Sequence, residues 1–271
     1  MDVVGIFILP PSKTELIKRL QTRGRDTQNE MKKRMNLVQN EISHFLEYDY
    51  VVVNKDLQTL KEKEHHIPGV MSFTDKKEQY LGIAIGDVSG HGISSALVMS
   101  LCSVLIRAIG KNLKSPSKTL ERVNTELIKY LKQAHNIYVT VFYSMLYIDS
   151  LKLVYSKAGH PPILLSHSDG TIEELQTEGT FLGMFDDEDY EERSIKLEKG
   201  DKVVFYTDGI TEIRNPENEE YGIERLKDLI TQHQTEPADA LQSLIFDTLK
   251  DFSEKAPLRD DQTLVIISID K

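Results

Sequence analysis

The first part of the chain alternates short apolar runs with segments of helical periodicity. The apolar run at 3–9 predicts a buried strand that ends before two consecutive prolines. Capping boxes at 12–15 and 27–30 begin two predicted helices, which run to about residues 22 and 45. The run YDYVVVN at 48–54 predicts a second short strand, and a charged stretch follows it. We therefore expect an α/β segment that ends near residue 65.

From about residue 80 the pattern changes to many short strands with amphipathic helices between them. The run YLGIAIGD predicts a strand ending at Asp87, and a helix over 94–109, closed by Gly110, follows it. Ser115-Pro116 opens a second helix with an apolar face. This order favours an α+β layered domain. The remaining expected strands are 137–148, 151–157, 161–166, 170–176, 202–207 and the C-terminal TLVIISI, and the remaining expected helices are about 221–233 and 237–252.

Composition narrows the class of protein. The chain has 271 residues, 39% of them apolar and 28% charged, which is typical of a globular protein with one large or two small domains. No uninterrupted apolar run reaches the ~20 residues of a membrane helix, and the start lacks the basic region of a signal peptide. Cys102 is the lone cysteine, which excludes an internal disulfide. We therefore expect a cytoplasmic protein without a membrane segment.

The net charge of −10 is unevenly distributed. Residues 1–65 hold 11 Lys and Arg against 10 Asp and Glu, a net +1, and the remainder holds 22 against 33, a net −11. This acidity favours solubility, and part of it is available for binding cations. The sequence has no basic stripe, so we expect no nucleic-acid partner.

Three aspartates follow or precede apolar strand-like runs. Asp87 lies in IGDVSGHG, Asp208 in FYTDGITE, and Asp261, preceded by Asp260, in LRDDQTLVI. A single Asp-Gly pair usually marks a turn, and that interpretation stays open for each of them. Together, three carboxylates without a Cys or His cluster favour a hard cation such as Mg²⁺ or Mn²⁺.

The segments GDVSGHGISSALVM, YSKAGHPPILL, GTFLGMF, VVFYTDGITEIRN, YGIERL and RDDQTLVII occur in this order. As an ordered set they resemble the PPM phosphatases of the SpoIIE/RsbU type over about 80–271. The resemblance implies a sandwich of two β-sheets flanked by helices, with a centre of two Mn²⁺ or Mg²⁺ ions at one edge. It also implies a substrate, phosphoserine or phosphothreonine on a regulatory protein such as an anti-sigma-factor antagonist.

The resemblance also implies roles for individual residues. Asp87 matches the aspartate that bridges both metals, and the carbonyl of Val88 takes the adjacent ligand position. Asp208 and Asp261 match the two further metal carboxylates, and Asp260 matches a supporting position. Two divalent ions lower the pKa of a shared water, and the resulting hydroxide attacks phosphorus.

Two histidines are candidates for a general acid, since an imidazole titrates near pH 6.5. His91 lies in a Ser-Gly-His-Gly turn close to Asp87 and is the stronger candidate for a direct role. His160 lies in Ala-Gly-His-Pro-Pro, where we expect a structural role in a turn.

The segment at about 3–57 resembles the C-terminal part of guanylate kinases. By that resemblance Arg19, Arg23 and Arg34 match lid and phosphate-contacting arginines, and Asn54 matches an asparagine near adenine. The chain contains no G-x-x-x-x-G-K-[ST] motif, so we expect no kinase activity. We interpret 1–65 as a kinase-like fragment and 66–271 as the phosphatase-type domain, with a tethering role or a homodimer left open.

The junction departs from the phosphatase pattern. Where the family has Gly-Gly-Asp-[Phe/Tyr]-Tyr, this chain has IPGVMSFTDKKEQ, in which Gly69 remains and Asp75 is expected in a polar turn. We therefore expect an incomplete sheet edge. Three functions remain open: a metal-dependent protein phosphatase, a non-catalytic phosphatase-like binding module, and a guanylate kinase, which the missing P-loop disfavours.

Overall fold

The computed structural model describes residues 6–9, 50–53, 70–75, 78–90, 93–131, 137–254 and 261–269. Contacts divide the chain into two compact units, Met1–Met71 and Ser72–Lys271. Each unit is described here by itself.

The first unit contains a parallel pair of strands. β1 (Ile6–Leu9) pairs with β2 (Tyr50–Val53), with Ile6 opposite Tyr50. Both strands were expected from their apolar runs. A parallel pair needs a long crossover between its strands, which agrees with the 40 residues that separate these two. The predicted helices of that crossover, the three arginines and Asn54 lie outside the described residues.

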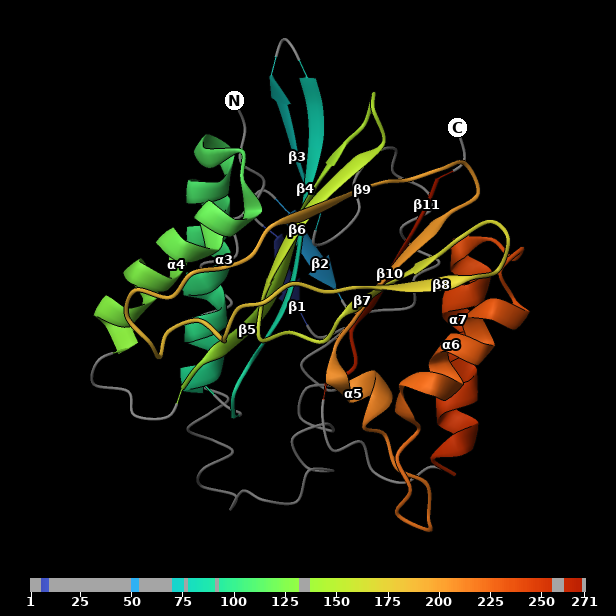
Figure 1. The fold of residues 1–271 in the computed structure, drawn as a ribbon. Coiled ribbons are helices and arrows are strands. Elements are labelled where there is room, and N and C mark those ends of the chain that lie inside the picture. Colours follow the sequence, from blue (N-terminus) through green and yellow to red (C-terminus); the bar gives the residue numbers. More distant parts are fainter. Residues whose placement is uncertain are drawn as a thin grey trace. The chain divides into compact units, whose positions relative to one another are not determined.

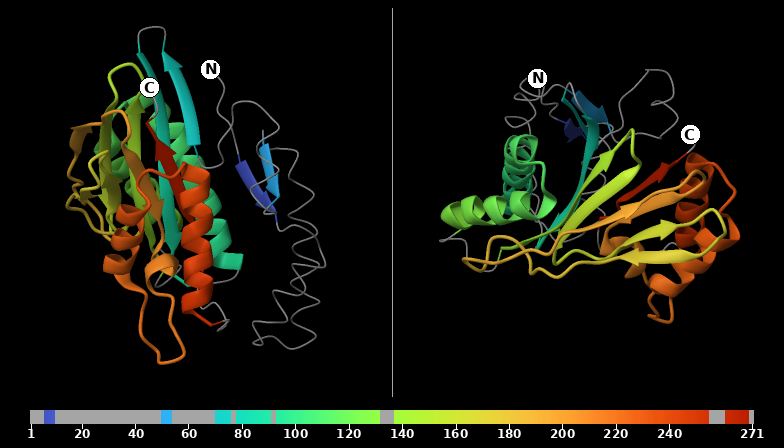
Figure 2. Two further views of the ribbon diagram at one scale, coloured as in Figure 1. Left: turned by 90° about the vertical axis from the view of Figure 1, so that its right-hand side faces the viewer. Right: turned by 45° about the horizontal axis from the view of Figure 1, so that its top comes forward.

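The second unit is built on two antiparallel sheets, which face each other in Figure 2. The five-stranded sheet has the order β3 (Val70–Asp75), β4 (Glu78–Val88), β5 (Val139–Tyr147), β6 (Lys152–Ala158) and β9 (Arg193–Lys196). The four-stranded sheet has the order β11 (Leu264–Ser268), β10 (Lys202–Tyr206), β7 (Ile163–Ser166) and β8 (Ile172–Leu175).

Helices cover the outer face of each sheet (Figure 1). Helices α3 (Ile93–Leu113) and α4 (Pro116–Leu131) pack on the five-stranded sheet, and α6 (Gly222–Gln232) and α7 (Ala238–Phe252) pack on the other. Between the sheets, the rings of Phe142 and Phe205 meet edge to face at 6.0 Å. The predicted α+β class, a β-sandwich flanked by helices, is confirmed.

The central strand β5 shows why a nearly continuous apolar run forms a strand here. All of its residues except Thr140 and Tyr147 are buried. A strand covered by helices on one face and a second sheet on the other loses the usual alternation of apolar and polar residues. β5 therefore forms the rigid centre of the unit, and Asp87 on β4 lies directly opposite its residue Thr140.

Helix α4 begins as its sequence predicts. The hydroxyl of Ser115 accepts the amide of Lys118 at 3.3 Å, and Pro116 is the first helical residue. The Glu192 carboxylate accepts bonds from Ser115 Oγ at 2.6 Å and from the Ser117 amide at 3.1 Å. This carboxylate at the positive end of the helix dipole ties the β8–β9 connection to α4. The predicted apolar face is buried: Leu120, Val123, Leu127 and Leu131.

Helix α3 is longer than expected. Gly110 does not end it, and the helix continues to Leu113. A Cβ at Gly110 would lie 2.6 Å from the Tyr143 hydroxyl, so this glycine permits a close approach of the helix to β5. Ser94–Leu113 is long and apolar enough to cross a membrane. A long core helix of a globular domain meets the same two criteria, so they alone do not identify a membrane span. The helix packs against β4 and α4.

Three short elements were not expected. β9 and the single-turn helix α5 (Asp208–Thr211) are each four residues long, too short for a periodic pattern to reveal. β3 is an edge strand beside β4. Asp75 is its last residue, so the expectation of a polar turn at Asp75 was wrong: pairing with β4 extends the backbone through it.

Candidate metal centre at the strand ends

Asp208 and Asp261 lie on neighbouring strand ends. β10 pairs with β11 up to Tyr206 opposite Leu264, and the ladder continues from the Thr207 amide to the Thr263 carbonyl at 3.1 Å. The Thr207 hydroxyl accepts the Thr263 amide at 3.1 Å and donates to the Asp261 carbonyl at 3.3 Å. These bonds hold the two segments together beyond the last ladder pair.

Gly209 permits the closest approach at this edge. A Cβ at this position would clash with the main-chain carbonyl oxygen of Asp261. The Asp208 carboxylate accepts the Gly209 amide at 3.0 Å, a bond that orients the carboxylate at the start of α5. The main chain thus brings the segments of Asp208 and Asp261 together, while the role of their carboxylates as metal ligands stays a prediction.

Asp87 lies on the other sheet. It is the second-last residue of β4 and is partly exposed, and its neighbour Val88 is buried opposite Val139. Beyond the strand end, the Ser89 amide donates to the Tyr138 carbonyl at 2.9 Å, and the Ser89 hydroxyl accepts the Tyr138 amide at 2.9 Å. The strand that carries Asp87 and Val88 is therefore bonded along its whole end.

His160 connects the two sheets. Its side chain is 1% exposed and lies in the connection from β6 to β7. Its Nδ1 lies 3.1 Å from the Thr140 hydroxyl, and its Nε2 lies 3.1 Å from the Tyr206 carbonyl oxygen. Thr140 is the residue opposite Asp87, and Tyr206 ends the strand that leads to Asp208.

The partners of His160 define its protonation. A carbonyl oxygen only accepts, so Nε2 carries the proton and donates to Tyr206. Burial lowers the pKa of His160 to about 4, so the ring is neutral at pH 7 and Nδ1 accepts the Thr140 proton. A buried, neutral ring whose two nitrogens both form hydrogen bonds within the protein is not placed to act as a general acid. The expected structural role of His160 agrees with this geometry, while His91 lies outside the described residues.

The three aspartates have the ligand chemistry of a hard-cation site, but among the described residues they do not form a tight cluster. Carboxylates at strand ends are the ligands that Mg²⁺ and Mn²⁺ prefer. Asp87 and Asp208 are partly exposed and Asp261 is exposed, so all three are accessible to an ion. Among the side chains that the structure describes, no three His, Cys, Asp or Glu residues come together closely enough to hold a metal. Asp260 lies outside that part of the chain.

Thr140 and Thr207 were not predicted as site residues from the sequence. Each is a hydroxyl within an apolar strand or at its end, a pattern typical of any β-structure. Only their partners, which come from strands distant in sequence, mark them as parts of this edge.

Comparison with known proteins decides the family. The family described as Stage II sporulation protein E (SpoIIE) matches residues 77–270. The chain belongs to the SpoIIE family. The predicted resemblance over about 80–271 is confirmed, and so is its PPM-type fold.

A curated relative and a solved structure support this SpoIIE domain. Phosphoserine phosphatase RsbU of Bacillus subtilis is 33% identical over 198 residues, which cover 71% of this chain and 56% of the relative. The chain thus spans about half of that relative's length. The SiaA-PP2C domain of Pseudomonas aeruginosa superimposes with a TM-score of 0.63 at 20% identity, covering 74% of this chain and 81% of that chain. Family and fold together identify residues 77–270 as a SpoIIE domain with a PPM-type fold.

The residues before the SpoIIE domain resemble a different family. The guanylate kinase family matches residues 1–67. Guanylate kinase of Histophilus somni is 54% identical over 65 residues, which cover 24% of this chain and 31% of that kinase. The expected kinase-like fragment is confirmed as a resemblance, while the boundary at residues 65 and 66 stays a prediction.

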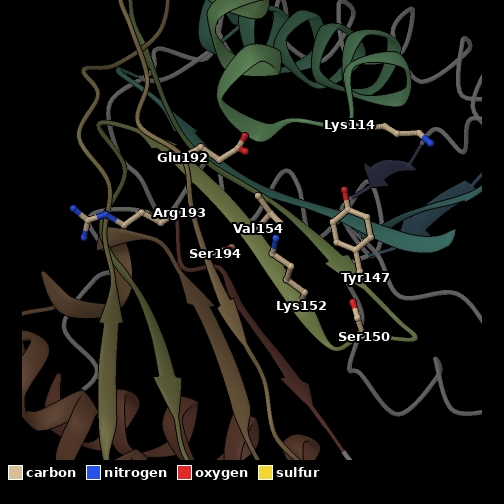
Figure 3. A pocket seen from close by; sticks show the side chains of 8 residues that line it. All are labelled: Lys114, Tyr147, Ser150, Lys152, Val154, Glu192, Arg193 and Ser194. Atoms are coloured by element: carbon tan, nitrogen blue, oxygen red, sulfur yellow. The ribbon is translucent and has the colours of Figure 1, made fainter.

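Figure 3 shows the side chains that line a surface pocket of about 400 Å³ on the SpoIIE domain. Tyr147 lines it, and Tyr147 pairs with Tyr80 at the opposite end of β4 from Asp87. At about 3.3 Å per residue, the seven steps along β5 from Thr140 to Tyr147 span roughly 23 Å. The pocket is therefore no part of the candidate metal centre. Its lining comprises Lys114, Tyr147, Ser150, Lys152, Val154, Glu192, Arg193 and Ser194.

Proposed function

We propose that this chain is a metal-dependent protein phosphatase that hydrolyses phosphoserine or phosphothreonine on a regulatory protein. The observation that carries the proposal is the strand-end arrangement: Asp208 and Asp261 lie on bonded segments of one sheet, and His160 bonds this sheet to the residue opposite Asp87. The similarity to RsbU, a phosphoserine phosphatase, supports the same reaction. An anti-sigma-factor antagonist is the substrate that we propose.

Asp87, Asp208, Asp261 and the carbonyl of Val88 would hold two Mn²⁺ or Mg²⁺ ions. When bound, such ions lower the pKa of a water and neutralise charge on the phosphoryl group. The chain's own contribution is placement, since hydrogen-bonded strand ends limit the motion of the carboxylates. The carboxylate of Asp208 is held by its bond to the Gly209 amide, and the segment of Asp261 is held by Thr207.

A phosphate-release assay on a phosphoserine protein with and without Mn²⁺ tests the proposal. We expect release that depends on Mn²⁺ and falls by at least about 10²-fold in Asp208→Asn, because the amide keeps the shape and removes the charge. The matched control is Asp228→Asn in α6, which neutralises one carboxylate elsewhere and should retain activity.

The same assay separates the alternative function. If the wild-type chain folds and binds a phosphoprotein yet releases no phosphate at any Mn²⁺ concentration, it is a non-catalytic binding module. Equal release by the wild type and Asp208→Asn would disprove the metal mechanism.

A further inference from the structure

The corner between β6 and β7 is the place where the chain passes from one sheet to the other. Gly159 enters it with a φ of 65°, and a Cβ there would lie 3.1 Å from the Phe181 amide nitrogen. The amide of Gly159 donates to the Gly179 carbonyl at 3.0 Å. The backbone before His160 is therefore held on two sides, which fixes where its ring projects.

The two ring nitrogens of His160 form hydrogen bonds to different sheets. Nδ1 meets Thr140 on β5, and Nε2 donates to the Tyr206 carbonyl on β10. Thr140 is registered directly against Asp87, and its hydroxyl oxygen lies 3.5 Å from the Asp87 carbonyl oxygen. Two residues beyond Tyr206 the chain reaches Asp208.

We propose that His160 and Thr140 form a positioning pair, which sets the spacing between the strand end that carries Asp87 and the strand end that leads to Asp208. This inference rests on the proposed function, because it takes these aspartates as metal ligands. In this proposal, neither member of the pair is itself a metal ligand or a substrate contact.

Directional bonds matter at this place because the sheets also meet through apolar side chains, such as the rings of Phe142 and Phe205. Apolar packing is favourable but not directional, so it leaves the relative shift of two sheets weakly specified. A ligand set functions only when its members are held within about 0.5 Å of the productive geometry. A buried threonine hydroxyl also costs free energy unless it is paired, and Thr140 is paired with His160. Partners that orient metal ligands typically change metal affinity by about 10–100-fold when removed.

The test uses the full-length, metal-free chain and measures the Mn²⁺ dissociation constant by titration calorimetry. Thr140→Val keeps the shape and removes the hydroxyl, and we expect affinity to fall by at least about 10-fold. Thr140→Ser restores the hydroxyl, and we expect affinity within about twofold of wild type. The matched control is Thr119→Val, which removes another buried hydroxyl, one that donates to the Ser115 carbonyl at 2.7 Å in α4. It should leave the affinity unchanged.

A double variant tests the pairing itself. His160→Gln places an amide near the Tyr206 carbonyl but offers nothing at the position of Nδ1. Because Thr140 has then already lost its partner, adding Thr140→Val to His160→Gln should weaken Mn²⁺ binding no further. Nitrogen NMR of the metal-free wild type should show His160 protonated at Nε2 and bare at Nδ1.

Each outcome decides between the two proposals. If the wild type binds no Mn²⁺, the proposed function fails and takes the positioning role with it. If the wild type binds Mn²⁺ and Thr140→Val binds it equally well, the inference alone is overturned. It is also overturned if Thr119→Val weakens Mn²⁺ binding as much as Thr140→Val does. The same holds if the losses of Mn²⁺ affinity at positions 140 and 160 add in the double variant, or if NMR shows the proton of His160 on Nδ1. Should Thr140→Val not fold, His160→Gln alone must weaken binding by a similar factor, and full affinity there overturns the inference.

Discussion

At the scale of single residues, backbone atoms determine which side chains this edge tolerates. Gly209 lies against the main-chain carbonyl of Asp261, and His160 has a backbone carbonyl and a threonine hydroxyl as its two partners. A side chain larger than hydrogen at position 209 would meet the Asp261 carbonyl, and a side chain at position 160 must serve both hydrogen-bond partners. Each therefore supports a prediction that an exposed position would not.

Gly209→Ala should destabilise the chain and weaken Mn²⁺ binding. The added methyl overlaps the Asp261 carbonyl, a backbone atom that moves only if β10 and β11 separate at their ends. We expect the free energy of unfolding to fall by about 1–3 kcal/mol, as for other overpacked sites. Urea denaturation and calorimetry measure the two effects. Ser243→Ala on the exposed side of α7 is the control, and equal stability of both variants would contradict the close approach.

The buried His160 predicts a loss of stability in mild acid. Its pKa is lowered to about 4 in the folded chain, against an ordinary value of about 6.5, because burial disfavours the charged ring. Between these values the unfolded chain binds more protons than the folded chain does. Stability from this group is therefore fully present above about pH 6.5 and is lost as the pH falls towards 4, by up to about 1.4 kcal/mol per unit.

Urea denaturation at pH 7 and about pH 5 measures this loss in the wild type and in His160→Gln. The variant cannot titrate at this position, so its stability should fall less over the same interval. An identical pH dependence in both chains would show that His160 is not buried in its neutral form.

At the scale of elements, the packing between α3 and β5 explains a glycine in the last turn of a helix. In an exposed helix, replacing Gly by Ala adds about 1 kcal/mol of stability. Gly110 faces the Tyr143 hydroxyl, and Tyr143 is fully buried, so the ring has no free space to enter. The tertiary contact thus opposes the helix propensity.

Gly110→Ala should therefore lower stability, by about 1–3 kcal/mol. Tyr143→Phe removes the oxygen that the new methyl would meet. In a Tyr143→Phe background, Gly110→Ala should lose most of its cost. Thermal unfolding of the four chains gives the coupling between the two sites, and additive effects would contradict the contact.

At the scale of the whole molecule, one chain carries matches to two families. The residues of the SpoIIE match form the four-stranded sheet, four strands of the five-stranded sheet and the four long helices described, while the kinase-like residues contribute the parallel pair β1 and β2. The kinase-like segment matches about a third of a guanylate kinase, and the chain has no P-loop motif.

The full chain should therefore form no ADP when it is incubated with ATP, GMP and Mg²⁺. A phosphate cradle needs the glycine-rich loop and its lysine, and neither occurs in this sequence. A coupled ADP assay with an intact guanylate kinase as the positive control provides the measurement. ADP formation that requires GMP would overturn our interpretation of residues 1–65.

The sequence by itself determined the family and the α+β class, because ordered motifs and apolar runs are local features of the chain; the three aspartates stay a prediction from the same motifs. It also predicted most strands and helices, since each long element carries its own period. Three features depended on tertiary structure: the closeness of Asp208 to Asp261, the continuation of α3 through Gly110, and the bonds of His160 to Thr140 and Tyr206. Each is a contact between segments distant in sequence, and no local pattern encodes which distant atom a buried donor will meet.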